Sequence, residues 1–141
     1  MRRSTGGMMA STDVWCHETV LPPEPASASH ARDFVCLQLI EHQMLYLVED
    51  IRLVASEFAT IAMVQSHASF TMRLERIDET VRLTVTEGSP SSSARMPARA
   101  VESGRQGLSV VEVVSQAWGV EADPGGPRSL WASFGVRSRF L

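Results

Sequence analysis

Apolar and polar residues follow two different periods along this chain, and the change of period separates helices from strands. Over residues 26–42 and 44–64, apolar side chains recur at every third or fourth position, which is the period of one helical face. Ser27 or Ser29 is placed to cap the first of these helices. The second helix has the clearest apolar stripe in the chain, made up of Leu47, Val48, Ile51, Val54, Ala55, Phe58 and Ala62.

A period of two follows these helices and predicts strands with one buried face. Residues 70–75 and 81–86 alternate between apolar and polar side chains, and the sequence IDET between them predicts the turn of an antiparallel hairpin. Residues 118–122 and 129–136 predict a second hairpin, joined by DPGGP. Before the helices, residues 18–21 predict a short edge strand, because Pro22 and Pro23 cannot continue a hydrogen-bonded ladder.

A third helix begins at a pair of glycines. Gly104 and Gly107 bracket two polar residues just where a helical apolar pattern starts at Leu108. The start of a helix has unpaired backbone N–H groups and a positive dipole end, and glycine lets a phosphate oxygen approach the backbone closely. The same glycines can also serve only to turn the chain, so the motif alone leaves both interpretations open.

The order of these elements predicts an α+β fold. Strand, helix, helix, strand, strand, helix, strand and strand give a two-layer sandwich, with three helices on one face of a mixed, mostly antiparallel sheet. Residues 1–15 lack periodicity and are expected to form a flexible tail, and residues 16–141 form one domain. Residues 89–103, which are rich in serine, proline and alanine, are long for a connection and are expected to form a mobile lid.

The charge of the chain limits its partners. It has 141 residues, a net charge of −3, no lysine and no basic run. A nucleic-acid or membrane-surface partner normally requires positive charges clustered on one face, so neither partner is expected.

The cysteines and histidines of the sequence do not indicate a disulfide framework or a metal site. Cys16 and Cys36 are too few for a disulfide or metal scaffold and are expected to be reduced thiols. His17, His30, His42 and His67 lack the spacing of a metal site. Residues 4–17 do not supply the apolar core of an export signal, and no apolar run is long enough to span a membrane. We therefore expect a cytoplasmic protein.

Five ordered stretches of the chain resemble one known family. They read LPPEPAS, LVASEFATIAM, VRLTVTEGSP, GRQGLSVVEVVSQAWGV and PGGPRSLWASF, and together they extend over about residues 19–137. In this order and at these separations they resemble the anti-sigma-factor serine kinases of the gyrase and histidine-kinase ATP-binding superfamily. The resemblance implies the Bergerat fold, an ATP pocket between the sheet and the lid, and a sigma factor or an anti-sigma antagonist as partner.

Two positions on the second helix bear on catalysis. The resemblance implies that Glu57 is the general base acting on the attacking hydroxyl group. Ile61, one turn later, occupies the place of the family's asparagine that ligates Mg²⁺. Magnesium requires oxygen ligands and isoleucine has none, so the metal site is incomplete and phosphoryl transfer is weakened.

The remaining positions concern the adenine and the phosphates. Glu87 occupies the place of an aspartate that reads the adenine amino group, and its carboxylate is one methylene longer. Gly88 is the small residue beside it, and Ser129 replaces a threonine expected near the adenine. The glycine-rich box around the phosphates is matched by Gly104, Gly107, Leu108 and Ser109.

Three hypotheses for function remain at this stage. The first is an ATP-dependent serine kinase that holds a sigma factor and phosphorylates its antagonist, favoured by Glu57 and the glycine-rich box. The second is a catalytically inactive module that captures the same partners, favoured by Ile61. The third is a scaffold of unrelated function that has kept the fold. A homodimer is compatible with each.

Overall fold

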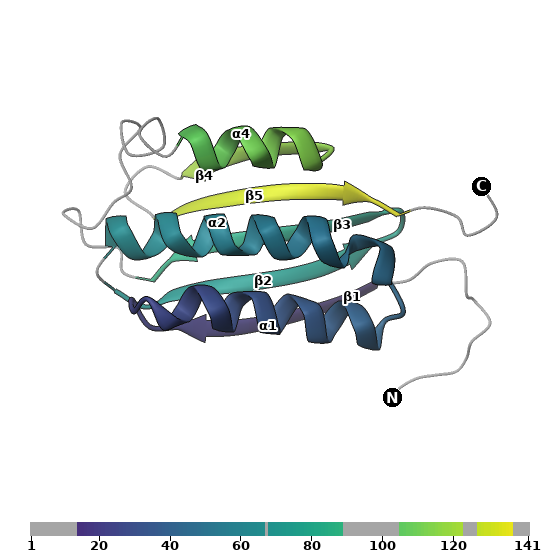
Figure 1. Cartoon of the computed structure of the whole chain (residues 1–141), viewed down its shortest axis with the longest axis horizontal. Coiled ribbons are helices and arrows are strands. Elements are labelled where there is room, and N and C mark those ends of the chain that lie inside the picture. Colours follow the sequence, from purple (N-terminus) through teal and green to yellow (C-terminus); the bar gives the residue numbers. More distant parts are fainter. Residues whose placement is uncertain (1–13, 67, 89–104, 123–126, 137–141) are drawn as a thin grey trace.

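The computed structural model describes residues 14–66, 68–88, 105–122 and 127–136. In this part of the chain, helices cover one face of a five-stranded sheet with strand order β1-β2-β3-β5-β4 (Figure 1). The elements are β1 (Val14–Leu21), α1 (Ala26–Glu41), the 3₁₀ helix η1 (Leu45–Leu47), α2 (Val48–Ser66), β2 (Phe70–Ile77), β3 (Thr80–Glu87), α4 (Arg105–Val114), β4 (Ala117–Ala122) and β5 (Arg128–Gly135). The predicted α+β class is confirmed.

The sheet is antiparallel throughout the described residues and contains no parallel pair there. Both predicted hairpins, β2–β3 and β4–β5, are confirmed. Between β1 and β2 the chain forms two long helices, which return it to the end of the sheet where β1 finished. The next strand must therefore run opposite to β1, which explains why the expected mixed sheet is not observed.

Strand β1 is longer than expected. It begins at Val14, which pairs with Ile77, and ends at Leu21, which pairs with Phe70. Val14 and Trp15 are thus part of the sheet, although the sequence placed them in a flexible tail. Polar residues next to them hid the alternation that is typical of a strand. The pairing with β2 places both residues in the sheet. Residues 1–13 of the expected tail lie outside the described residues.

Helix α1 lacks the predicted serine cap. Its N-cap is Pro25, with no capping hydrogen bond from a side chain. Ser27 is fully buried instead, and its hydroxyl group donates to the carbonyl oxygen of Pro22 at 2.5 Å. This bond ties the start of the helix to the proline pair that ends β1.

Helix α2 supplies the centre of the core. The predicted helix over residues 44–64 is divided into η1 and α2, and the predicted stripe is confirmed along α2. Phe58 is fully buried and, with Phe70, is one of the two largest fully buried side chains, so replacing it with alanine would cost about 3–5 kcal/mol. The other fully buried positions of the helix are Ile51, Val54, Ala55, Ala59 and Ala62.

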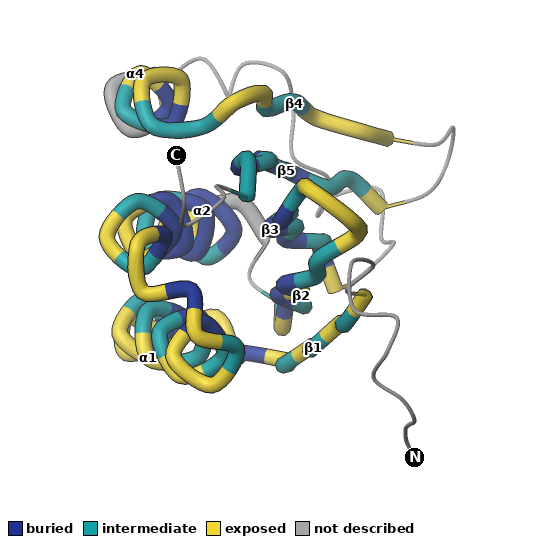
Figure 2. The backbone as a smooth tube through the Cα atoms, turned by 90° about the vertical axis from the view of Figure 1, so that its right-hand side faces the viewer, coloured by how far each residue is buried: buried dark blue, intermediate teal, exposed yellow. Residues whose placement is uncertain are grey.

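The sheet has two faces of different chemistry, here called the inner and the outer face. The inner face packs against the helices. Its side chains from β2, β3 and β5, among them Phe70 and Phe134, are almost wholly buried. Alternate residues point to the outer face and are partly exposed. Figure 2 shows α1, α2 and α4 on the inner side and no described helix on the outer side. Because successive residues of a strand point to opposite faces, side chains of neighbouring strands can contact each other only when they lie on the same face.

Gly88 follows β3 at a point of close backbone contact. A Cβ atom built on Gly88 would lie 1.7 Å from the carbonyl oxygen of Ser69, a backbone atom that cannot rotate away. We predict that Gly88→Ala destabilises the fold by about 2 kcal/mol and lowers the melting temperature by roughly 5–10 °C, as measured by calorimetry.

Gly135→Ala is the matched control for this prediction. Its added Cβ would meet only the end of the Gln116 side chain, at 3.1 Å, and that side chain can move. The control should remain within about 0.5 kcal/mol of the unmodified protein. Equal stability of the two variants would show that the Gly88–Ser69 approach is not required.

Candidate functional site

Segments that are far apart in the sequence meet at one end of the sheet, on the left in Figure 1. They are the C-terminal half of α2, the end of β3, the start of α4 and the start of β5. The pairing of Phe70 with Glu87 and of Thr86 with Ser129 fixes the three strand ends relative to one another. The elements at this end carry Glu57, Glu87 and Gly107, and we call this part of the molecule the α2–β3–α4 end.

Glu57 lies on the flank of α2 that faces α4. Asp50, Val114 and Phe134 line a hollow of about 270 Å³, so the Asp50 flank of α2 is directed toward the end of α4. Glu57 comes two helical turns after Asp50 and therefore lies on the same flank. On the opposite flank, Ser56 accepts a hydrogen bond from Nη1 of Arg32 in α1 at 3.0 Å. Glu57 itself is partly exposed.

Ile61 lies one turn beyond Glu57 and belongs to the hydrophobic core. Its exposed fraction is 9%, and it packs with the other buried residues of α2. An isoleucine here adds apolar area to the helix layer and offers no ligand for a cation. Among the described residues there is also no group of three histidine, cysteine, aspartate or glutamate side chains able to hold a metal ion.

Glu87 is the most buried charged residue of the described chain, with an exposed fraction of 3%. It ends β3 on the inner face, in line with Val85. Because Thr86 pairs with Ser129, one further step along the register brings Arg128 beside Glu87. An arginine in this position can offset part of the cost of burying a carboxylate. Sequence reasoning did not single out Arg128, because its relation to Glu87 depends on the β3–β5 register.

Gly88 and the start of α4 complete this end of the molecule. The close approach of Ser69 gives Gly88 a structural requirement of its own, independent of any ligand. Gly107 lies in the first turn of α4, Leu108 is buried with an exposed fraction of 4%, and Ser109 is exposed. Leu108 therefore anchors the first turn and leaves Ser109 on its open side. Gly104 and the expected lid over 89–103 lie outside the described residues.

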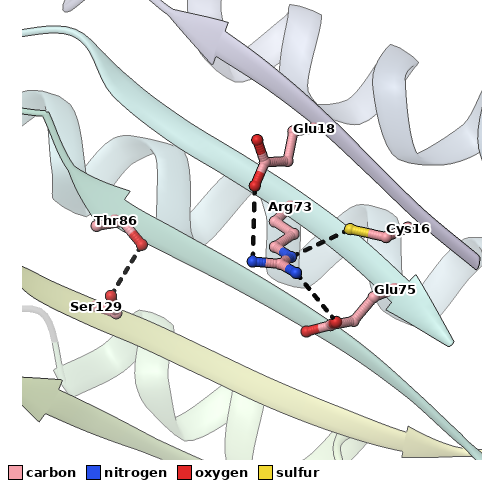
Figure 3. Close-up of polar contacts among 6 residues, drawn as sticks. All are labelled: Cys16, Glu18, Arg73, Glu75, Thr86 and Ser129. Atoms are coloured by element: carbon pink, nitrogen blue, oxygen red, sulfur yellow. Dashed lines mark hydrogen bonds and ion pairs between the residues drawn. The ribbon is translucent and has the colours of Figure 1, made fainter. Parts of the chain in front are cut away.

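Ser129 is separated from the other candidates. Its side chain lies on the outer face, where its hydroxyl group is 2.8 Å from that of Thr86 (Figure 3). Glu87, Ile61 and Leu108 belong to the inner side. The sheet itself therefore stands between Ser129 and the candidates at the α2–β3–α4 end, which the order of motifs in the sequence did not reveal.

The outer face carries a polar cluster around Arg73 that sequence reasoning missed. Its Nε donates to Sγ of Cys16 at 3.1 Å, and its Nη atoms lie 3.7 Å from Glu18 and 3.6 Å from Glu75 (Figure 3). The hydrogen bond to Cys16, and then the charge of Glu75, raise the pKa of Arg73 above its ordinary value. These residues stand at alternate positions of two strands, but their contacts follow only from the β1–β2 register.

A second charged group lies further across the same face. Arg82 stacks over the ring of Trp131 at 4.3 Å and pairs with Glu121 at 3.2 Å. Both clusters border a shallow hollow of about 510 Å³ that also reaches Ser129. Exposed ion pairs of this kind contribute little to stability, so the outer face is a polar surface rather than a second core.

The arrangement separates two kinds of chemistry. The α2–β3–α4 end combines a partly exposed carboxylate, a buried carboxylate and the start of a helix, and only the helix start favours an anion. No helix in the described part of the chain has the length and apolar character needed to cross a bilayer.

Searches against protein-family models and against curated proteins found no match for this chain. The resemblance to the anti-sigma-factor kinases therefore stays a prediction that rests on the motifs of the sequence.

Proposed function

We propose that this chain is an ATP-binding regulator of transcription related to the anti-sigma-factor serine kinases. The observation that carries the proposal is that α2 packs against both β3 and α4, with Glu57, Glu87 and Gly107 on these three elements. A two-layer α+β sandwich with this element order is compatible with a Bergerat-type nucleotide pocket. ATP would lie between the end of β3 and the start of α4.

Each group would have a separate role toward the nucleotide. The first turn of α4 supports the phosphates through unpaired N–H groups and the helix dipole. The Glu87 carboxylate, at the end of β3, would accept a hydrogen bond from the adenine amino group. Glu57 would accept the proton of an attacking hydroxyl group. Mg²⁺ would supply charge neutralisation when bound, but Ile61 offers it no oxygen ligand.

The partner in this proposal is a sigma factor or its antagonist, and the location is the cytoplasm. A net charge of −3 with no basic run favours a protein partner over nucleic acid. A homodimer could present two such surfaces.

A second candidate function is a catalytically inactive module that captures the same partners. The burial of Ile61 in the core favours it, because the position has become part of the packing of α2. The two candidates differ in their need for nucleotide. A sigma factor recovered equally with and without ATP supports the module, and recovery that depends on ATP supports the first proposal.

We predict that ATP binds weakly and with little dependence on Mg²⁺. The missing metal contact removes an interaction of roughly 1.5–3 kcal/mol, or about ten- to a hundredfold in affinity. In calorimetry of the full chain, replacing Mg²⁺ with a chelator should change the Kd for ATP by less than about threefold. Tight binding that is abolished by the chelator would contradict the prediction.

Ile61→Asn tests the position directly. The amide oxygen should raise ATP affinity in the presence of Mg²⁺ by about one power of ten or more. The same change buries a polar group in the core, so the melting temperature without nucleotide should fall, by an amount equivalent to about 1–3 kcal/mol. Calorimetry and thermal unfolding measure the two effects separately.

Val64→Asn is the matched control, because Val64 lies one turn later on α2 and is 61% exposed. It introduces the same amide at a solvated position and should change neither stability nor affinity. If folded Ile61→Asn shows no more Mg²⁺-dependent binding than this control, Ile61 does not face the phosphates.

A further inference from the structure

Two histidines that are 25 residues apart face each other where β1 meets the end of α1. Nε2 of His17 and Nε2 of His42 share a hydrogen bond of 3.0 Å, in which either ring can be the donor, so a metal ion would replace this bond. His17 is held by its pairing with Leu74 in the β1–β2 ladder. Both residues are partly exposed, so the pair is open to small solutes. This contact was not predicted, because the two histidines do not have the spacing of a metal-binding motif in the sequence.

The backbone around His42 fixes the position of its ring. His42 is the C-cap of α1, and its N–H donates to the carbonyl oxygen of Gln38 at 3.0 Å. Gln43 has a left-handed conformation with φ of 60°, and the N–H of Met44 then donates to Leu39 at 2.8 Å. This helix end turns the chain sharply and leaves the His42 side chain directed toward β1.

Trp15 holds the same ring from one side. The Trp15 and His42 rings are stacked, with centroids 3.9 Å apart and planes 7° apart. The Trp15 and His17 rings are 5.5 Å apart and tilted. Cys16 lies between Trp15 and His17 in the sequence. Its side chain points to the outer face and contacts Arg73, so it does not belong to this group of rings. The two imidazoles are thus fixed by two elements and an indole before any ligand arrives.

We propose that His17 and His42 form a two-imidazole binding site for a divalent transition-metal ion of tetragonal geometry, such as Cu²⁺ or Ni²⁺. Imidazole nitrogen is a preferred ligand of these ions. In the metal-bound form each imidazole carries its proton on Nδ1 and directs the Nε2 lone pair at the ion. Water completes the coordination, and the ion joins the edge strand β1 to the end of α1.

The separation of the two nitrogens suits a tetragonal ion. Two nitrogens bound to one ion at about 2.0–2.1 Å, and 3.0 Å from each other, subtend about 95° at the ion. This is close to the angle of about 90° between neighbouring ligands of a square-planar or octahedral ion and well below the tetrahedral value of about 109°. Zn²⁺, which is usually tetrahedral in proteins, should therefore bind less tightly than Ni²⁺ or Cu²⁺.

The test uses the full chain without an affinity tag, titrated with Cu²⁺ and Ni²⁺ by calorimetry and tryptophan fluorescence. We expect one ion per chain and a loss of affinity of at least tenfold in His17→Ala and in His42→Ala. His30→Ala is the matched control, since His30 is an exposed histidine of α1 and should retain the affinity. Unchanged affinity in either test variant, or Zn²⁺ binding more tightly than Ni²⁺, would overturn the proposal.

Two further measurements do not depend on how well the alanine variants fold. The electron paramagnetic resonance spectrum of the Cu²⁺-loaded unmodified chain should show coupling to two imidazole nitrogens, and coupling to none or one would overturn the site. Trp15→Phe should lose most of the fluorescence quenching, because Trp15 stacks on His42. Quenching that persists in this variant would place the ion elsewhere.

Discussion

The packing of α2 against the inner face of the sheet is the constraint on which the rest of the structure depends. Phe58 and its fully buried neighbours on α2 contact strands whose inner side chains are also excluded from water. Burial of this kind is the main favourable term in folding. It fixes the rotation of α2 about its axis, and that rotation decides that Ile61 is buried while Glu57 is partly exposed.

The one-sided helix layer also divides the polar residues of the sheet into two groups. Glu87 is on the inner side and must be accommodated without water, at a strand end where Arg128 is its neighbour by register. Arg73 and Arg82 are on the outer face and form ion pairs in contact with solvent. The helices cover the inner side, so the outer cluster lies on the face of the sheet that no described helix covers.

The sequence predicted elements well wherever the period was determined by burial. The alternation around Leu74 and Leu83 identified the β2–β3 hairpin, and the stripe through Phe58 identified α2. It failed where a contact outside the local sequence decided the outcome. Val14 is in a strand because it pairs with Ile77, and Ser27 is not a cap because Pro22 accepts its hydrogen bond.

The candidate site was predicted only in part, for the same reason. The motifs name Glu57 on α2, Glu87 at the end of β3 and Leu108 in α4, and their joint role in one site stays a prediction. They could not show that Ser129 lies on the other face, or that Arg128 stands beside Glu87. The alternation of β5 places Ser129 on the face opposite Leu130, which the motif match did not use, whereas the position of Arg128 depends on the β3–β5 register.

The central claim is that a nucleotide binds where β3, α2 and α4 meet. Amide hydrogen exchange of the full chain, with and without saturating ATP, tests it most directly because it locates protection along the backbone. Slower exchange is expected around Gly88 and in the first turns of α4, with no change in β1 or in the outer cluster around Arg73. Protection confined to the outer face, or no protection at any ATP concentration, would contradict the claim.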